Sequence, residues 1–315
     1  MYGNELNKVT NNYGSNKGNT NERACRCKLC KRQIARGYGV AYVGGYNGGG
    51  YICDTCQRTI SYHGGNDTKV GTTKKHGWII SPELECNKCN DNVAMYLQSL
   101  GFNKESDCTV LYEFTGRMFE GSKGLSTILK RLDLEYTQGH FDTTRENVGT
   151  HLNISKKDEN GNNLISMYSD ILNNYSNSLR VGLSQYLLNN PNICAYMFGR
   201  CIGGWAGTID ANTDTYEHGV YLNFQHINEG SASRLEWRIC KYNSGIENGG
   251  KDAYFRAIDT CKKLTEIILK ACSDIQKIEA VEGRTTSNRN KRMAVCEKAT
   301  DRMIKYLEKE YNKTH

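Results

Sequence analysis

Charged side chains alternate with apolar ones in residues 234–240 (RLEWRIC), and this alternation is the first pattern in the chain that could carry chemistry. An extended strand would direct Arg234, Glu236 and Arg238 to one face and their apolar neighbours to the other. The carboxylate could hold a metal ion, and the two guanidinium groups could bind phosphoryl or carboxylate oxygens. An ordinary amphipathic strand with a solvated, salt-bridged face has the same pattern. The functional interpretation is favoured because similar patterns occur upstream.

Two further stretches place carboxylates on the polar face of a strand. In 78–86 (WIISPELEC), Glu83 and Glu85 lie two residues apart, so a strand would bring them side by side. Adjacent carboxylates repel each other unless a cation or solvent separates them. In 108–115 (CTVLYEFT), Glu113 falls on one face of a second predicted strand.

Residues 149–155 (GTHLNIS) alternate in the same way, with His151, Asn153 and Ser155 in a row opposite two aliphatic side chains. An imidazole, an amide and a hydroxyl in one row could bind a metal ion and a nucleotide. A lone histidine in a strand is more often structural. Together with the carboxylates of the other strands, however, this row describes a site for more than one Mg²⁺, which prefers oxygen ligands and shares them with phosphates.

The elements that must position these side chains are strands interleaved with helices, which predicts an α+β fold. Apolar periodicity predicts four helices that pack against the sheet and one final helix. The predicted helices cover 91–101, 121–133, 164–190, 252–278 and 293–311, and a further strand is expected at 221–225.

Two CxxC pairs near the N-terminus predict a zinc ribbon. Cys27 and Cys30 form the first pair and Cys53 and Cys56 the second, with a glycine-rich hairpin between them, and four thiolates complete a closed, structural zinc site. Cys25 could replace Cys27, although its spacing suits a zinc knuckle less well. A third CxxC pair, at residues 86 and 89, could supply further zinc ligands or plain buried thiols.

The composition limits the class of protein without deciding it. The chain has 315 residues and a net charge of +7 that is spread along its length, so nucleotides, RNA and acidic peptides are all possible partners. No apolar signal core opens the chain and no stretch has the length of a membrane span, so we expect a cytoplasmic protein without a membrane partner. The expected organisation is a disordered leader at 1–23, the zinc ribbon at 24–62, a catalytic domain at 76–280, and a basic loop with the last helix at 281–315.

The order of these motifs resembles the amidoligases of the glutamine synthetase and glutamate–cysteine ligase superfamily, in particular their phage and bacterial branch. The resemblance covers roughly residues 25–260. Glu-x-Glu, a second strand glutamate, Gly-x-His-x-Asn-x-Ser and Glu-x-Arg occur there in this order. It implies a curved, mainly antiparallel sheet flanked by helices and a cytoplasmic location, which is the host cytoplasm if a phage encodes the chain.

The resemblance also implies roles for individual residues. Mg²⁺ ions would be held by Glu83, Glu85, Glu113, His151 and Glu236. Asn153 and Ser155 would lie against ATP, Arg238 would neutralise the transferred phosphate, and Arg200 would bind substrate or phosphate. The sequence departs from the family at Pro82, which is unexpected in a central strand. A further acidic ligand is not evident, and Asp107 or Glu120 are the candidates for it.

The activity implied by the resemblance is an ATP- and Mg²⁺-dependent ligase that joins a carboxylate substrate to an amine through an acyl phosphate. The alternative is a zinc-ribbon protein that binds nucleic acid or another protein and carries a catalytically degenerate ligase-like domain. The net charge and the basic loop at 283–292 favour that alternative.

Overall fold

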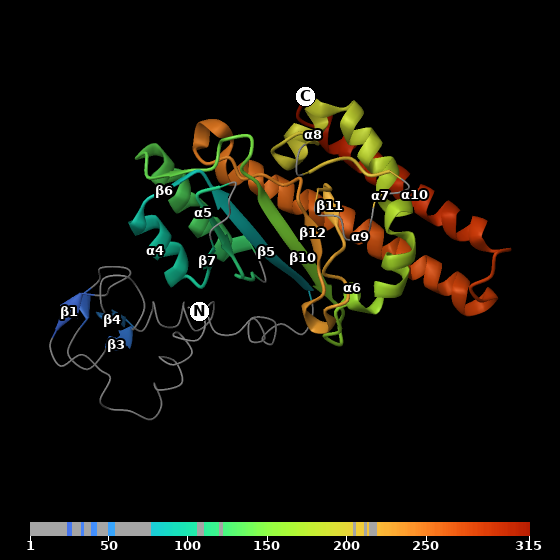
Figure 1. Cartoon of the computed structure of the whole chain (residues 1–315), viewed down its shortest axis with the longest axis horizontal. Coiled ribbons are helices and arrows are strands. Elements are labelled where there is room, and N and C mark those ends of the chain that lie inside the picture. Colours follow the sequence, from blue (N-terminus) through green and yellow to red (C-terminus); the bar gives the residue numbers. More distant parts are fainter. Residues whose placement is uncertain are drawn as a thin grey trace.

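The computed structural model describes residues 24–26, 33–34, 39–42, 50–53, 77–105, 110–119, 122–203, 206–210, 213 and 219–315. Its main feature is a mixed α+β fold around a six-stranded antiparallel sheet, with strand order β11–β12–β10–β5–β8–β7 (Figure 1). The strands are β5 (Gly77–Cys86), β7 (Asn103–Glu105), β8 (Tyr112–Thr115), β10 (Thr150–Lys157), β11 (Leu222–Asn223) and β12 (Leu235–Trp237). The α+β class predicted from the sequence is confirmed.

The two long central strands, β5 and β10, divide their side chains between a core face and a polar face. Ile80 and Leu84 of β5 and Leu152 and Ile154 of β10 are fully or almost fully buried in the core. The alternate residues, which include Glu83 and Glu85, point to the opposite face. Period-two alternation therefore predicted the faces of these strands correctly.

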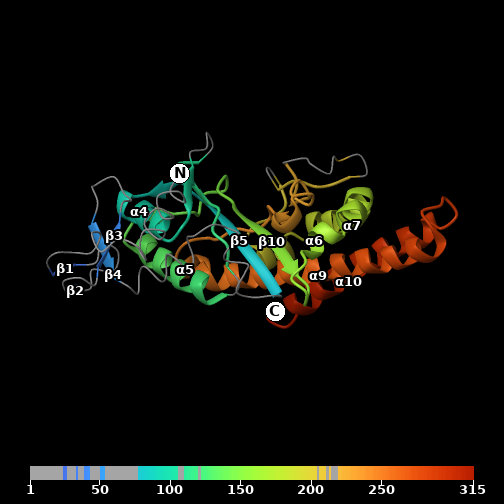
Figure 2. The same cartoon turned by 90° about the horizontal axis from the view of Figure 1, so that it is seen from below.

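Seven α-helices lie in the described part of the chain, and the longest, α9, runs along the core face of the sheet (Figures 1 and 2). The indole N–H of Trp237 on β12 donates to the Thr265 hydroxyl of α9 at 3.0 Å, inside the core. The helices are α4 (Asp91–Ser99), α5 (Ser122–Thr137), α6 (Leu164–Met167), α7 (Ser169–Asn189), α8 (Pro191–Phe198), α9 (Gly250–Glu282) and α10 (Arg289–Tyr311).

The single helix predicted over 164–190 is wrong in detail. A one-turn helix, α6, is capped by the Asn163 side chain, which accepts from the N–H groups of Ile165 and Ser166, and α7 begins only after Tyr168. Pro191 ends α7, as predicted, because the residue before it, Asn190, is driven out of the helical region. The same proline then opens α8, which the sequence did not reveal.

Pro82 lies within β5 despite the rule against proline in a central strand. On β5, three residues lie between Ile80 and Leu84. Their pairing partners, Phe119 and Phe114, have four residues between them, so the neighbouring segment contains one extra residue. Gly116, with φ +81°, lies in this bulge. Ile80 directs its backbone N–H and C=O toward Phe119. The backbone direction repeats every two residues in a strand, so the nitrogen of Pro82, which carries no hydrogen, also faces the bulge. The proline therefore removes no ladder hydrogen bond.

Short strands account for the described residues of the N-terminal region. β1 (Cys25–Arg26) pairs with β2 (Gln33–Ile34), and β3 (Gly39–Tyr42) pairs with β4 (Gly50–Cys53) as the predicted glycine-rich hairpin. Cys27, Cys30 and Cys56 lie outside the described residues, and only the backbone of Cys53 is described. The zinc ribbon therefore stays a prediction, as does the disordered leader at 1–23.

Smaller elements complete the description. β6 (Lys88–Cys89) pairs with β9 (Phe141–Asp142) beside the end of β5, and two short 3₁₀ helices lie at Gly230–Ala232 and Ile246–Asn248. Within the described ranges, none of the helices combines the length and the apolar character that crossing a membrane requires.

Candidate metal and nucleotide site

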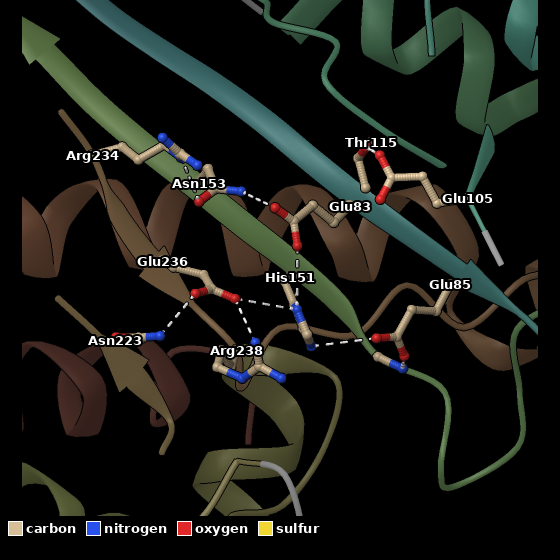
Figure 3. Close-up of polar contacts among 11 residues, drawn as sticks. Glu83, Glu85, Glu105, Thr115, His151, Asn153, Asn223, Arg234, Glu236 and Arg238 are labelled. Carbon is tan, nitrogen blue, oxygen red and sulfur yellow. Dashed lines mark hydrogen bonds and ion pairs between the residues drawn. The ribbon is translucent and has the colours of Figure 1, made fainter. Parts of the chain in front are cut away.

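Several of the predicted site residues lie together on the polar face of the sheet, opposite α9, and Figure 3 shows Glu83, Glu85, His151 and Glu236 among them. The register of the strands explains this. His151 of β10 pairs with Glu83 of β5, and Glu85 pairs with Glu113 of β8. On the other side of β10, Asn153 pairs with Glu236 of β12. Four neighbouring strands thus bring their polar side chains to one area.

His151 lies at the centre of this area and is buried. Its Nδ1 is 3.4 Å from Glu83 Oε2 and 3.3 Å from Glu236 Oε1, and its Nε2 is 3.6 Å from Glu85 Oε1. Although Nδ1 is buried and close to two carboxylates, it makes no hydrogen bond of normal geometry. A buried polar atom without such a partner indicates a missing group.

The pKa values of these groups depend on one another. Burial by itself would lower the pKa of His151, but the carboxylates of Glu236 and Glu83 outweigh it and raise that pKa to about 9. Burial would likewise raise the pKa of Glu236, yet His151 and Arg238 hold it at about 2. Glu113 behaves differently, because burial and then repulsion from Glu83 and Glu85 raise its pKa to about 7. Part of the rise in the pKa of Glu113 is thus repulsion between neighbouring carboxylates.

Among the residues that the structure describes, two groups of side chains have ligand atoms close enough to hold a metal ion. Glu83, His151 and Glu236 form one group, and Glu85, Glu113 and His151 form the other, with the ligand atoms of each group within 4.8 Å of one another. Carboxylate oxygens with one imidazole are a suitable donor set for Mg²⁺ or Mn²⁺. The orphaned Nδ1 and the mutual repulsion of the carboxylates both fit a divalent cation at this place.

Several contacts fix the carboxylates. Asn153 Nδ2 donates to Glu83 Oε1 at 2.6 Å, and Asn223 Nδ2 of β11 donates to Glu236 Oε2 at 3.1 Å. Glu85 accepts from the backbone N–H of Gly149. A Cβ at Gly149 would lie 3.0 Å from His151 Nε2 and 3.2 Å from Glu85 Oε2, so this glycine allows the close approach. These neighbours orient the proposed ligands.

Cationic side chains gather at one end of the acidic group. Arg238 Nη1 donates to Glu236 Oε1 at 2.6 Å. Burial lowers the pKa of Arg200, which the nearby Glu85 partly opposes and the like charge of Arg238 reinforces. Lys241 is buried and donates to the carbonyls of Thr144 and Arg145 at 3.0 and 2.7 Å. Both arginines predicted for the site are thus close to its carboxylates.

A cavity of about 650 Å³ opens at the other end of the site. Asn153 and Ser155, which were predicted to contact a nucleotide, are among its lining residues. Asn153 is not free, however, because its amide bridges Glu83 and Arg234, whose Nε donates to Asn153 Oδ1 at 3.1 Å. Other lining residues are Ile79, Ser81, Glu83, Glu105, Glu113, Thr115, Lys157 and His226.

Arg234, which the alternation of 234–240 placed on one face with Glu236 and Arg238, precedes β12 and lines the cavity. Two other polar residues of this site had no predicted role. Glu105 of β7 pairs with Glu113 and accepts from the Thr115 hydroxyl at 2.9 Å. Asn223 of the predicted strand 221–225 faces Glu236. Asp107 and Glu120, the candidates for a further acidic ligand, lie outside the described residues.

The third CxxC pair forms no metal group among the residues that the structure describes. Cys86 and Cys89 are buried thiols, and their Sγ atoms donate to the carbonyls of Tyr112 and Asn90 at 3.5 Å. Hydrogen bonding to Cys89 and burial raise the pKa of Cys86 well above its usual range, which keeps it a thiol. Of the two alternatives, the described residues favour plain buried thiols.

Comparison with known proteins adds nothing to this picture. No protein-family model matches the chain, and no curated protein matches it. Functional inference therefore depends on the order of the motifs and on the geometry described above.

Proposed function

We propose that the chain is an ATP- and Mg²⁺-dependent carboxylate–amine ligase with a glutamine synthetase-like, curved sheet. The observation that carries this proposal is the meeting of Glu83, Glu85, Glu113 and Glu236 around His151, a buried imidazole with an orphaned nitrogen. So many acidic groups on one sheet face are costly without a cation. A structural ion-pair network would need only one or two of them.

The carboxylates of the two ligand groups would hold the metal ions, and His151, whose neutral ring offers one lone pair, would ligate one of them. When bound, Mg²⁺ supplies positive charge that neutralises phosphate oxygens during transfer. Asn153, Asn223 and the Gly149 N–H orient the carboxylates for this purpose. His151 must lose its proton to act as a ligand, so its raised pKa makes the metal-free state the protonated one.

The cavity is the place for the nucleotide. Glu83 and Glu113 line it, so phosphates held by metal ions at these carboxylates would occupy that end. Arg234 and Lys157 bring positive charge to the cavity, and Ser155 brings a hydroxyl. A volume of about 650 Å³ lies in the usual range for small-molecule sites.

Arg238 and Arg200 would bind the substrate carboxylate and the transferred phosphoryl group. In the reaction, a carboxylate oxygen attacks the terminal phosphorus of ATP, ADP leaves, and an acyl phosphate forms. An amine then attacks the acyl carbon, phosphate leaves, and the amine nitrogen gives up one proton. The guanidinium groups stabilise the negative charge that spreads over the transferred group. A structural zinc ion at Cys27, Cys30, Cys53 and Cys56 and a cytoplasmic location complete the proposal.

The test is ADP release by the purified chain with ATP, Mg²⁺ and a screen of carboxylates and amines. Glu236→Gln should abolish the release that depends on both substrates. The lowered pKa of Glu236 means that its charge also stabilises the fold, so circular dichroism at the assay temperature must show that the variant is folded. Glu310→Gln is the control, because it removes a carboxylate on the last turn of α10 that pairs with the exposed Lys313, and it should behave as wild type.

Two results would contradict the ligase proposal. One is wild-type protein that binds no Mg·ATP at millimolar concentration, and the other is an undiminished rate in Glu236→Gln. Salt-sensitive binding of nucleic acid without nucleotide binding would instead favour the alternative of a zinc-ribbon binding protein.

A further inference from the structure

Three side chains form a continuous chain of contacts along one wall of the cavity. Arg234 Nη1 pairs with Glu229 Oε2, and Glu229 Oε1 contacts His226 Nδ1 at 2.6 Å. At the other side of the guanidinium, Arg234 Nε donates to Asn153 Oδ1, which links the chain to Glu83. His226 and Arg234 both line the cavity.

These contacts leave one donor edge of Arg234 unused. Its Nε and Nη1 are engaged, whereas its Nη2 makes no hydrogen bond with the residues that the structure describes. A guanidinium held at two of its nitrogens has few orientations left. The remaining edge is available for an anion in the cavity.

The turn that carries these residues is itself braced. The N–H of Arg234 donates to the carbonyl of His226 at 3.0 Å and closes the segment between them. Asn163 donates to the carbonyls of Ser231 and Ser233 at 3.1 and 2.7 Å from the start of α6. The positions of His226 and Glu229 relative to Arg234 are therefore set by the backbone.

The charge of Glu229 also fits a supporting role. Burial would raise its pKa, but His226 and Arg234 lower it, so the carboxylate stays ionised. An ionised carboxylate that pairs with Nη1 fixes the orientation of the guanidinium, which keeps its positive charge. His226 occupies the second oxygen of Glu229 and so limits the rotation of that carboxylate.

We propose that Glu229 and His226 are positioning residues that hold Arg234 for contact with the phosphates of the bound nucleotide. The inference rests on the proposed function, because it takes the ligand of the cavity to be Mg·ATP. It assigns no chemical step to His226 or Glu229, which act only through Arg234.

The test is the affinity for Mg·ATP, measured by isothermal titration calorimetry on the full chain. Arg234→Ala should weaken binding by about 10- to 100-fold, since a charge-assisted hydrogen bond is lost. Glu229→Gln should weaken it by about three- to tenfold, because the guanidinium stays but is less fixed. Glu266→Gln is the matched control, since this carboxylate is 47% exposed against 41% for Glu229 and pairs with Lys156 and Lys263 away from the cavity. It should bind as wild type.

Two comparisons separate positioning from a merely structural role. In the double variant Arg234→Ala/Glu229→Gln, affinity should equal that of Arg234→Ala alone, because Glu229 has nothing left to position. His226→Asn, whose amide N–H can replace Nδ1–H, should retain wild-type affinity, whereas His226→Ala should lose about two- to fivefold. Melting temperatures of all the variants should stay within a few degrees of wild type.

The outcomes decide the matter. Additive losses in the double variant, or unchanged affinity in Glu229→Gln, overturn this inference while the proposed function stands. Wild-type protein that binds no Mg·ATP overturns both.

Discussion

Glu113→Gln should stabilise the metal-free protein at alkaline pH while it weakens metal binding. Burial and repulsion from Glu83 and Glu85 raise the pKa of Glu113 from 4.5 to about 7. A carboxyl whose folded pKa is raised contributes stability that is fully present below its unfolded pKa and is lost as the pH rises through the folded pKa. At pH 8 the wild-type protein therefore pays the full electrostatic penalty of an ionised Glu113, and glutamine removes it.

The shift fixes the size of the effect. At 1.36 kcal/mol per pKa unit, a rise from 4.5 to about 7 corresponds to roughly 3 kcal/mol. Glu113 is only partly buried, and solvent screening reduces this to about 1–2 kcal/mol. At pH 4.5 or below, where the carboxyl is protonated in the folded protein, the two proteins should have similar stability. The whole difference should develop between pH 4.5 and 7.

Urea unfolding with a chelator at pH 4.5 and pH 8 measures this difference directly. Millimolar Mg²⁺ at pH 8 should then stabilise the wild-type protein more than the variant, because Glu113→Gln removes one ligand of the second group while the group of Glu83, His151 and Glu236 remains. Glu266→Gln controls for the loss of any carboxylate. Because hydrogen bonding to Lys263 lowers the pKa of Glu266, this substitution should lower the free energy of unfolding at pH 8, whereas Glu113→Gln should raise it. The reasoning is refuted if Glu113→Gln is the less stable protein at pH 8 without metal, or if Mg²⁺ stabilises both proteins equally.

Three other predictions follow from the same site. Mg²⁺ binding at pH 7 should release between about one and two protons, because His151 with a pKa of about 9 is protonated and Glu113 with a pKa of about 7 is half protonated. Calorimetry in buffers of different ionisation enthalpy counts the released protons. Zero release would exclude His151 as a ligand. Gly149→Ala should weaken Mg²⁺ binding by about tenfold or more, since the new Cβ would lie 3.0 Å from His151 Nε2. Titration with Mn²⁺ followed by electron paramagnetic resonance measures the affinity of the site for a divalent ion. An unchanged affinity would contradict the geometry. Thr265→Val should lower the free energy of unfolding in urea by about 1–2 kcal/mol, because it leaves the buried indole N–H of Trp237 unpaired. An unchanged free energy would mean that this hydrogen bond contributes nothing to stability.

The faces of the strands could be predicted from the sequence, whereas the contacts between strands could not. Alternation alone placed Glu83, His151 and Glu236 on polar faces, because neighbouring side chains in a strand point to opposite sides. Which of them meet depends on the register His151↔Glu83 and Asn153↔Glu236, and a shift of one residue would have turned every one of these side chains to the other face. The resemblance to the amidoligases supplied the expectation that they meet.

Residues that lie outside long strands were harder to recognise. The alternation of 234–240 gave the face of Arg234 but not its contacts. Arg234 stands just before β12, in a turn closed by the hydrogen bond from its N–H to the carbonyl of His226, 8 positions earlier. β7 has only three residues, too few to show a period, so Glu105 gave no signal. Pro82 seemed wrong for a central strand because a bulge on the neighbouring strand cannot be read from β5 itself.

Along β10, the cavity, the carboxylates and the arginines follow one another in a fixed order. Ser155 and Lys157 line the cavity, Asn153 links Arg234 to Glu83, His151 stands among the carboxylates, and Gly149 just before the strand contacts Glu85. Beyond this end, Arg200 is close enough to Glu85 for their charges to interact, and Arg238 pairs with Glu236. A ligase that passes a phosphoryl group from nucleotide to carboxylate needs anion binding on both sides of its metal ions, and the charges on this sheet face follow that order.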